Sequence, residues 1–179
     1  MKIPFTATRL MLPAFVAALI SGCAGSQPPL ATVDYVDLDR FMGDWYVIAN
    51  IPTFLEKGAH NAVETYALDA DGSIQTTFVF RKDSFDGKRK EYNPKGFVRN
   101  PETNAEWGMR FIWPIKADYR IVYLTEDYSQ TVIARNKRDF VWIMARTPEI
   151  PAADYERIIG LVADMGYDTS KVQKVPQRW

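Results

Sequence analysis

The chain has 179 residues, with 22 basic and 22 acidic side chains and a formal net charge of zero. This length is typical of a single domain, and the longest basic run, Lys88-Arg89-Lys90, is too short to indicate nucleic-acid binding. One histidine and one cysteine are too few for the common zinc ligand sets, and no phosphate-binding loop occurs. We therefore expect no nucleic acid, no metal and no cofactor.

The first 22 residues have the pattern of a secretory signal peptide. Lys2 and Arg9 precede an apolar run from Leu10 to Ile20, which is about half as long as a membrane-spanning helix. The single cysteine, Cys23, follows directly and cannot form an internal disulfide. From these residues alone, Cys23 either marks the end of the signal or is an incidental free thiol of an ordinary secreted protein.

The sequence Ile20-Ser21-Gly22-Cys23 resembles the lipobox of bacterial lipoproteins. The resemblance implies cleavage after residue 22 and acylation of Cys23, which would give a stable lipid anchor because several chains are attached. Ala24, in place of an aspartate, implies sorting to the outer membrane, facing the periplasm. Residues 23–35 are then the lipidated N-terminus and a tether, flexible over residues 24–32, and residues 36–179 are the folded domain.

Turn signals recur about every eight to twelve residues in that domain, which favours a sandwich or a barrel. Asp71-Gly72 is a strong hairpin signal, and Asp86-Gly87 and Asn100-Pro101 mark further turns. Eight strands are expected, over Trp45–Ile51, Val63–Asp69, Ser73–Arg81, Tyr92–Arg99, Ala105–Trp113, Ala117–Thr125, Gln130–Arg135 and Phe140–Arg146. Such a set predicts an all-β fold, an eight-stranded antiparallel up-and-down barrel with room for one small ligand.

One C-terminal α-helix is expected to pack on the barrel wall. Pro151 suits a first helical position and Gly166 suits a left-handed stop. Helical spacing gives one apolar face, formed by Tyr155, Ile158, Ile159, Val162 and Met165. Beyond the helix, Lys171–Val175 is a candidate ninth strand. Its edge could pair between chains, which leaves a homodimer open.

Three short motifs, in the expected order, resemble those of the lipocalins. Gly43-Asp44-Trp45-Tyr46 is similar to the first motif, Thr125-Glu126-Asp127-Tyr128 to the second, and Arg146 before Thr147-Pro148 to the third. The resemblance covers about residues 36–175 and is nearest to the bacterial outer-membrane lipoprotein branch. It implies structural roles for Gly43, Trp45, Tyr128 and Arg146. Arg146 can stack on Trp45 only if the sheet closes on itself.

Strand alternation predicts which side chains point into the barrel. Trp45 and Arg146 fix the phase of the first and last strands, whereas the phases of Val63–Asp69 and Tyr92–Arg99 stay undetermined. The expected interior is large, aromatic and almost uncharged, and consists of Val47, Ala49, Ile51, Phe78, Phe80, Trp107, Met109, Phe111, Trp113, Tyr119, Ile121, Tyr123, Phe140, Trp142 and Met144. An apolar ligand would bind to such a lining. The alternative is that the same aromatic side chains fill the barrel as a dry core.

The loop Pro52–Asn61 is the candidate lid of the open end. It carries Phe54 and Leu55 beside Glu56, Lys57 and His60. Lys57 or tyrosine hydroxyls could hold a ligand headgroup there, or the loop is simply solvated. His60 is the only histidine and no nucleophile-elbow motif occurs, so we expect no enzymatic activity.

Two functions follow. The resemblance implies a membrane-anchored protein that binds a fatty acid, a lysophospholipid or a similar small amphiphile, for lipid storage, transport or envelope maintenance under stress. The alternative is a structural or partner-binding envelope lipoprotein whose barrel is filled and holds no ligand. The sequence does not favour a haem carrier, because the only histidine, a common haem ligand, is expected in a loop.

Overall fold

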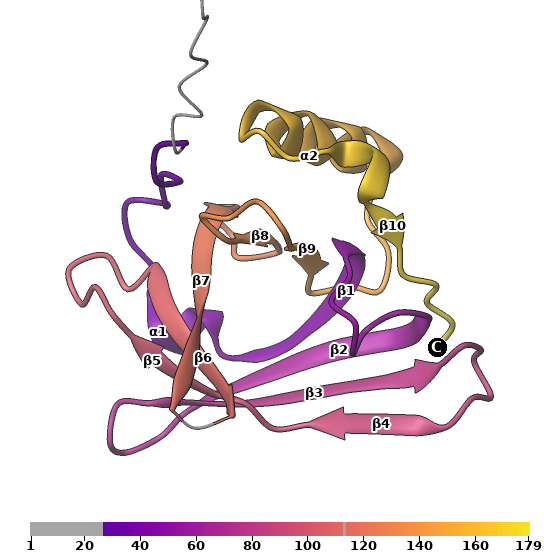
Figure 1. Ribbon diagram of the computed structural model, residues 1–179, viewed down its shortest axis with the longest axis horizontal. Coiled ribbons are helices and arrows are strands. Elements are labelled where there is room, and N and C mark those ends of the chain that lie inside the picture. Colours follow the sequence, from indigo (N-terminus) through magenta and orange to yellow (C-terminus); the bar gives the residue numbers. More distant parts are fainter. Residues whose placement is uncertain (1–26, 113) are drawn as a thin grey trace, which may run out of the picture.

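The computed structural model describes residues 27–112 and 114–179, and these form one antiparallel sheet that closes on itself (Figure 1). Closure occurs where the first strand, β1 (Gly43–Ile51), pairs with β9 (Val141–Ala145). The intervening strands are β2 (Ala59–Leu68), β3 (Ile74–Lys82), β4 (Arg89–Tyr92), β5 (Lys95–Val98), β6 (Glu106–Ile112), β7 (Ile115–Leu124) and β8 (Gln130–Ala134). The predicted eight-stranded barrel is confirmed, since β4 and β5 share one place beside β3.

The fourth predicted strand, Tyr92–Arg99, is in fact two short strands. β4 ends at Tyr92 and β5 begins at Lys95, with Asn93 and Pro94 between them. Proline has no N–H to donate to a neighbouring strand, so an uninterrupted ladder is unfavourable at this position. β4 begins at Arg89, before the predicted start at Tyr92 and shortly after the Asp86-Gly87 turn.

Two β-bulges change the predicted alternation. The register between β1 and β9 shifts between Val47 and Ala49, and the register between β7 and β8 shifts between Ile121 and Tyr123. One extra residue reverses the side to which every following side chain points. The inward assignments of Ala49, Ile51 and Tyr123 are therefore wrong: these residues pack in the apolar cluster outside the barrel, beneath the C-terminal helix.

The helix α2 (Ala152–Asp164) lies on the outer face of β1, β8 and β9, as predicted (Figure 1). Ile158 and Val162 are fully buried against Val132, Ile143 and neighbouring residues. The helix ends at Asp164 with Met165 as its C-cap, and Gly166 follows with a φ of +87°, a conformation that glycine adopts without steric cost. Pro151 precedes the first helical residue by one position.

Both ends of the described chain are attached to the barrel. Leu30 is buried in the cluster beneath α2, and the Pro28 carbonyl accepts a hydrogen bond from Arg138 at 2.8 Å. The expected tether over residues 24–32 is thus bound to the domain from Pro28 onward. At the other end, a 3₁₀ turn (Thr169–Lys171) leads into β10 (Gln173–Lys174), which pairs with β1 of the same chain. β10 stands at the end of the strand order, so among the described residues its other edge has no strand beside it.

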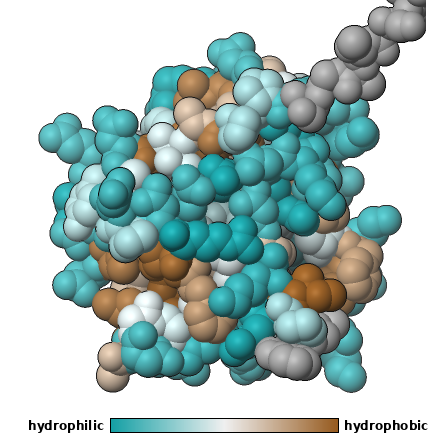
Figure 2. All heavy atoms as spheres, turned by 60° about the vertical axis from the view of Figure 1, so that its left-hand side comes forward, coloured by the Kyte–Doolittle hydropathy of each residue, from teal (hydrophilic) through white to brown (hydrophobic). Residues whose placement is uncertain are grey.

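The outer surface of the molecule is mostly polar on the face shown in Figure 2, as expected for a closed barrel with an apolar interior. Figure 2 shows one face, most of which is covered by hydrophilic side chains, with apolar residues emerging in limited patches. Among the described residues, no helix combines the length and the hydropathy needed to cross a bilayer. Residues 1–22 and Cys23 lie outside the described part of the chain.

Candidate functional site

One end of the barrel is filled by aromatic rings. Trp45, Trp107, Tyr66 and Phe41 are each at most 1% exposed. Phe41 belongs to the short helix α1 (Leu38–Phe41), which closes this end, and its ring lies 5.0 Å from Trp45 and 5.5 Å from Trp107. The carbonyl of Phe41 accepts a hydrogen bond from the Trp45 indole at 2.8 Å. We call these four residues the aromatic floor; here the barrel has the dry core that the alternative interpretation expected.

Arg146 fastens the floor from outside. Its guanidinium lies 3.8 Å from the centroid of the Trp45 ring and donates to the Asp44 carbonyl at 2.8 Å. Gly43, which starts β1 beside it, has a φ of +93° that disfavours any residue with a Cβ. Tyr128 accepts a hydrogen bond from the Asp37 backbone N–H through its hydroxyl at 2.8 Å. The motif residues thus meet at the closed end.

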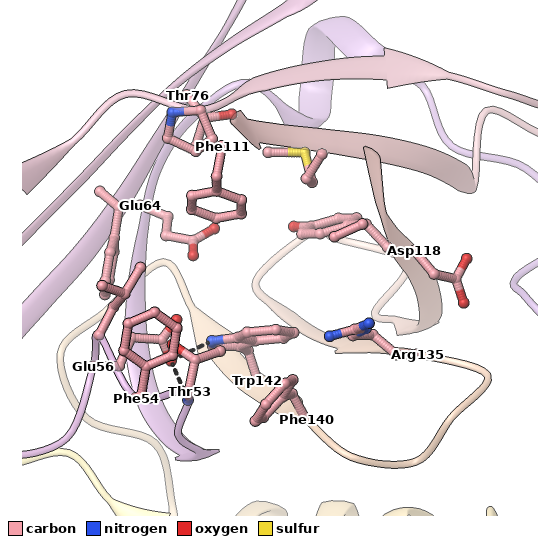
Figure 3. A pocket seen from close by; sticks show the side chains of 16 residues that line it. Thr53, Phe54, Glu56, Glu64, Thr76, Phe111, Asp118, Arg135, Phe140 and Trp142 are labelled. Carbon is pink, nitrogen blue, oxygen red and sulfur yellow. Dashed lines mark hydrogen bonds between the residues drawn. The ribbon is translucent and has the colours of Figure 1, made fainter. Parts of the chain in front are cut away.

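The other half of the barrel encloses a cavity of about 280 Å³ (Figure 3). That volume is at the lower edge of the range for small-molecule pockets, about 300–1,000 Å³. Its walls come from strands on all sides of the barrel and from the loop between β1 and β2. The lining residues are Thr53, Phe54, Leu55, Glu56, Glu64, Thr76, Phe78, Pro94, Met109, Phe111, Ala117, Asp118, Tyr119, Arg135, Phe140 and Trp142.

Glu56 fixes the β1–β2 loop at the mouth of the cavity. Its carboxylate accepts hydrogen bonds from the Trp142 indole at 3.0 Å and from the Thr53 backbone at 3.4 Å (Figure 3). It also accepts one from the Asn50 side-chain amide at 3.1 Å. Burial raises the pKa of Glu56 above its usual range, and the three donors oppose that rise. Phe54, by contrast, is 81% exposed although it lines the cavity, as expected for a side chain at an open rim.

A second carboxyl lies deeper in the barrel. Glu64 on β2 is opposite Trp45 on β1 and Phe78 on β3, and its carboxyl accepts a hydrogen bond from the Tyr66 hydroxyl. The Tyr66 and Tyr119 hydroxyls are 2.6 Å apart. Burial raises the pKa of Glu64 to about 7, the Tyr66 hydrogen bond opposes the rise, and repulsion from Glu56 adds to it.

Arg135 is the one basic residue that lines the cavity within the described part of the chain. It directly follows β8, and its guanidinium lies 5.3 Å from the centroid of the Phe140 ring. An ion pair joins its Nε to Asp139 at 3.5 Å. Tyr167 supports the position, because its hydroxyl accepts a hydrogen bond from the Arg135 backbone N–H at 2.9 Å.

The predicted interior residues fall into four groups. Six of them line the cavity: Phe78, Met109, Phe111, Tyr119, Phe140 and Trp142. Five are buried in the barrel core without lining it: Val47, Phe80, Trp107, Ile121 and Met144. Ala49, Ile51 and Tyr123 belong to the cluster beneath α2, as described above. Trp113 lies outside the described residues.

Sequence reasoning missed the polar part of the site. Glu64 lies on one of the two strands whose phase stayed undetermined, and the inward face of this strand carries both Glu64 and Tyr66. The expected rim cation, Lys57, does not line the cavity, and Arg135 lies there instead. His60 belongs to β2 and not to a loop, and its ring packs edge-on against Phe85 at 5.0 Å, away from the lining.

Comparison with known proteins agrees with this geometry. Residues 36–177 match the family model described as a lipocalin-like domain. Temperature-induced lipocalin-1 of Arabidopsis thaliana is 29% identical over 83% of each chain. The outer membrane lipoprotein Blc of Escherichia coli is 27% identical over 94% of this chain and 96% of its own length. The solved structure of the cockroach allergen Per a 4 superposes with a TM-score of 0.61 at 20% identity, covering 85% of this chain and 94% of that chain. The chain therefore belongs to the lipocalin-like family, whose barrels bind small hydrophobic ligands.

Proposed function

We propose that the protein binds a single-chain amphiphile, a fatty acid or a lysophospholipid, with its acyl chain in the cavity and its headgroup at the mouth. The observation that carries the proposal is the division of the barrel into a filled aromatic floor and an apolar cavity above it. Burying apolar surface contributes about 25 cal/mol per Å². A cavity of about 280 Å³ would accept one end of a long chain and leave its polar end outside.

Arg135 supports an anionic headgroup. It is the cation that the described lining offers, and its guanidinium lies beside the apolar rings of Phe140 and Trp142. A carboxylate or a phosphate reaching the mouth could pair with it in two parallel hydrogen bonds. Asp139 already neutralises part of this charge, so we expect the contribution to affinity to be modest.

Binding of an apolar chain is the activity that the described lining supports best. Its few polar groups are carboxyl, hydroxyl and guanidinium groups set among aromatic and aliphatic side chains. A structural lipoprotein with a filled barrel is the second candidate, and the filled floor favours it for the closed half only.

Displacement of a fluorescent fatty acid tests the ligand class. We expect soluble protein starting at Ala24 to bind the probe in a one-to-one complex, and dodecanoate and a lysophospholipid of equal chain length to compete for it. Arg135→Gln should weaken dodecanoate about three- to tenfold, roughly one exposed ion pair, and leave dodecanol unchanged. The proposal would be refuted if neither dodecanoate nor the lysophospholipid showed saturable binding.

The location at the envelope is a separate proposal. Residues 1–22 have the pattern of a signal peptide, Cys23 lies in a lipobox-like sequence, and several similar proteins are named outer membrane lipoproteins. We propose that Cys23 is acylated and that the protein is held on the outer membrane, facing the periplasm. Cys23→Ala should move the protein from the membrane fraction to the soluble fraction. Retention in the membrane fraction would point to a different attachment.

A further inference from the structure

An acidic group at the inner end of an apolar cavity is an unusual feature of this barrel. Glu64 lines the cavity one side-chain layer above the aromatic floor, because its neighbour on the same face of β2, Tyr66, belongs to that floor. Burying a carboxyl costs free energy unless hydrogen bonds or opposite charges compensate. No ion pair involves Glu64 in the part of the chain that is described.

The hydrogen bonds of Glu64 are incomplete. One oxygen accepts from the Tyr66 hydroxyl, which in turn lies 2.6 Å from the Tyr119 hydroxyl. A carboxylate offers about four acceptor sites, so most of its capacity is left for a group inside the cavity. The Thr76 hydroxyl, opposite Tyr66 in the β2–β3 register, is also buried and has no hydrogen-bond partner.

Because Glu64 and Thr76 have unused hydrogen-bonding capacity, the chemical nature of the chain end that enters first should affect affinity. A methyl group placed next to Glu64 would leave the carboxyl without its missing partners, which is costly in a dry site. A hydroxyl there could donate a hydrogen bond to the ionised carboxylate or accept one from the O–H of the neutral acid. A second carboxylate would be repelled whenever Glu64 is charged.

We propose that Glu64, supported by the Tyr66 and Tyr119 hydroxyls, is a specificity-determining group that selects ligands with a neutral hydrogen-bonding group, such as a hydroxyl, on the end that enters first. The proposal rests on the binding function above and narrows it to chains carrying a polar group at both ends. Amphiphiles with a plain methyl end would bind, but more weakly.

The selectivity against an inserted carboxylate should depend on pH. The groups that face Glu64 are the Tyr66 and Tyr119 hydroxyls, and the Glu56 carboxyl from the β1–β2 loop acts on it electrostatically. Asp118 and Arg135 are the remaining charged residues of the lining. With a pKa of about 7, Glu64 is mostly ionised at pH 8 and mostly neutral at pH 5.5.

Matched twelve-carbon ligands test the proposal. Dodecanoic acid, 12-hydroxydodecanoic acid and dodecanedioic acid share one headgroup and differ only at the far end, and dodecanol with 1,12-dodecanediol forms a pair without any acid. In the wild-type protein we expect the added hydroxyl to increase affinity about tenfold, as for one hydrogen bond to a charged group. We expect the diacid to bind more weakly than dodecanoic acid at pH 8, and this penalty to shrink at pH 5.5.

Variants assign the effect to a residue. Glu64→Leu should remove the hydroxyl preference and the pH dependence together, whereas Glu64→Gln should keep part of the preference and lose the pH dependence. Glu91→Gln is the matched control, because it changes an exposed carboxyl on β4 that does not line the cavity and should leave the preference intact. Tyr66→Phe, which removes the hydroxyl that donates to Glu64, gives a second route if Glu64→Leu does not fold.

The outcomes separate this inference from the binding function. Binding of all chains with no hydroxyl preference, or with the same preference in Glu64→Leu, would overturn the inference and leave the binding function standing. Discrimination between dodecanol and 1,12-dodecanediol without binding of any fatty acid would overturn the fatty-acid binding function and leave the role of Glu64 standing. Absence of binding by every ligand would overturn both.

Discussion

Removing Arg146 should destabilise the barrel without closing its cavity. The guanidinium lies 3.8 Å from the Trp45 ring centroid and donates to five backbone carbonyls. Four of these bonds measure 2.8–3.1 Å and one, to Tyr128, measures 3.4 Å. One side chain thus joins α1 and its C-cap, the start of β1 and the segment around Tyr128 at the closed end of the barrel. The acceptors are the carbonyls of Arg40, Phe41, Met42, Asp44 and Tyr128.

The magnitude follows from these contacts. A hydrogen bond to a charged group contributes about 1.5–3 kcal/mol, but the five share one guanidinium and cannot be added. A cation stacked on an indole contributes about 0.5–2 kcal/mol. Allowing for the partial exposure of Arg146, we expect Arg146→Ala to lower the free energy of unfolding by about 2–4 kcal/mol. For a domain of this size that is a fall in Tm of about 5–15 °C.

Urea denaturation followed by tryptophan fluorescence, with calorimetry for Tm, measures this loss. Arg146→Lys is the matched control: it keeps the charge but not the planar fork, so it should lose less than the alanine variant. Ligand affinity should change little, because Arg146 does not line the cavity. A loss below about 1 kcal/mol, the size of an ordinary surface ion pair, would refute the closure argument.

Three further predictions concern individual contacts. The pKa of Glu64 is about 7 in the folded protein and 4.5 as the reference value. The folded state therefore holds its proton to higher pH than the unfolded state does, and the free energy of unfolding should fall as pH rises from 4.5 to 7. Denaturation across this range should show that Glu64→Gln removes up to about 3 kcal/mol of that fall. Tyr167→Phe should cost about 1–3 kcal/mol of unfolding free energy, because the hydroxyl bonds to the backbone of Arg135 and Phe140. Gln177→Ala should lower Tm by a few degrees, since its amide bridges the Val47 and Ala62 carbonyls of β1 and β2. Wild-type behaviour of any of these variants would contradict the role given to that contact.

Local sequence signals were sufficient for the closed barrel and its helix. The Asp71-Gly72 turn and the Ile158–Val162 face of α2 are set by neighbours close in the chain, and they were predicted. The bulges at residues 47–49 and 121–123 were not, because an extra residue in a ladder depends on the partner strand. Their effect was to turn Ala49, Ile51 and Tyr123 outward.

The alternation pattern could not predict which part of the barrel is filled and which part is hollow. Trp107 and Phe111 lie on the same predicted face of β6, yet Trp107 is fully buried in the floor and Phe111 is 52% exposed at the rim. Height along the barrel separates them, and period-two alternation carries no information about height. For the same reason Glu64 could not be placed: an inward carboxylate conflicts with the usual polarity of a core, and only the cavity accounts for it.

Filling the cavity is the most direct test that it is a binding site. Ala117 lines the cavity from β7, opposite Met109 on β6, whereas Ala67 is exposed on β2 and serves as the matched control. We would titrate the wild-type protein, Ala117→Trp and Ala67→Trp with a fluorescent fatty acid and count bound ligands by native mass spectrometry. The cavity account predicts one ligand for the wild-type protein and for Ala67→Trp, and at least a tenfold loss of affinity for folded Ala117→Trp. Equal binding by all three proteins would show that the ligand does not occupy the cavity.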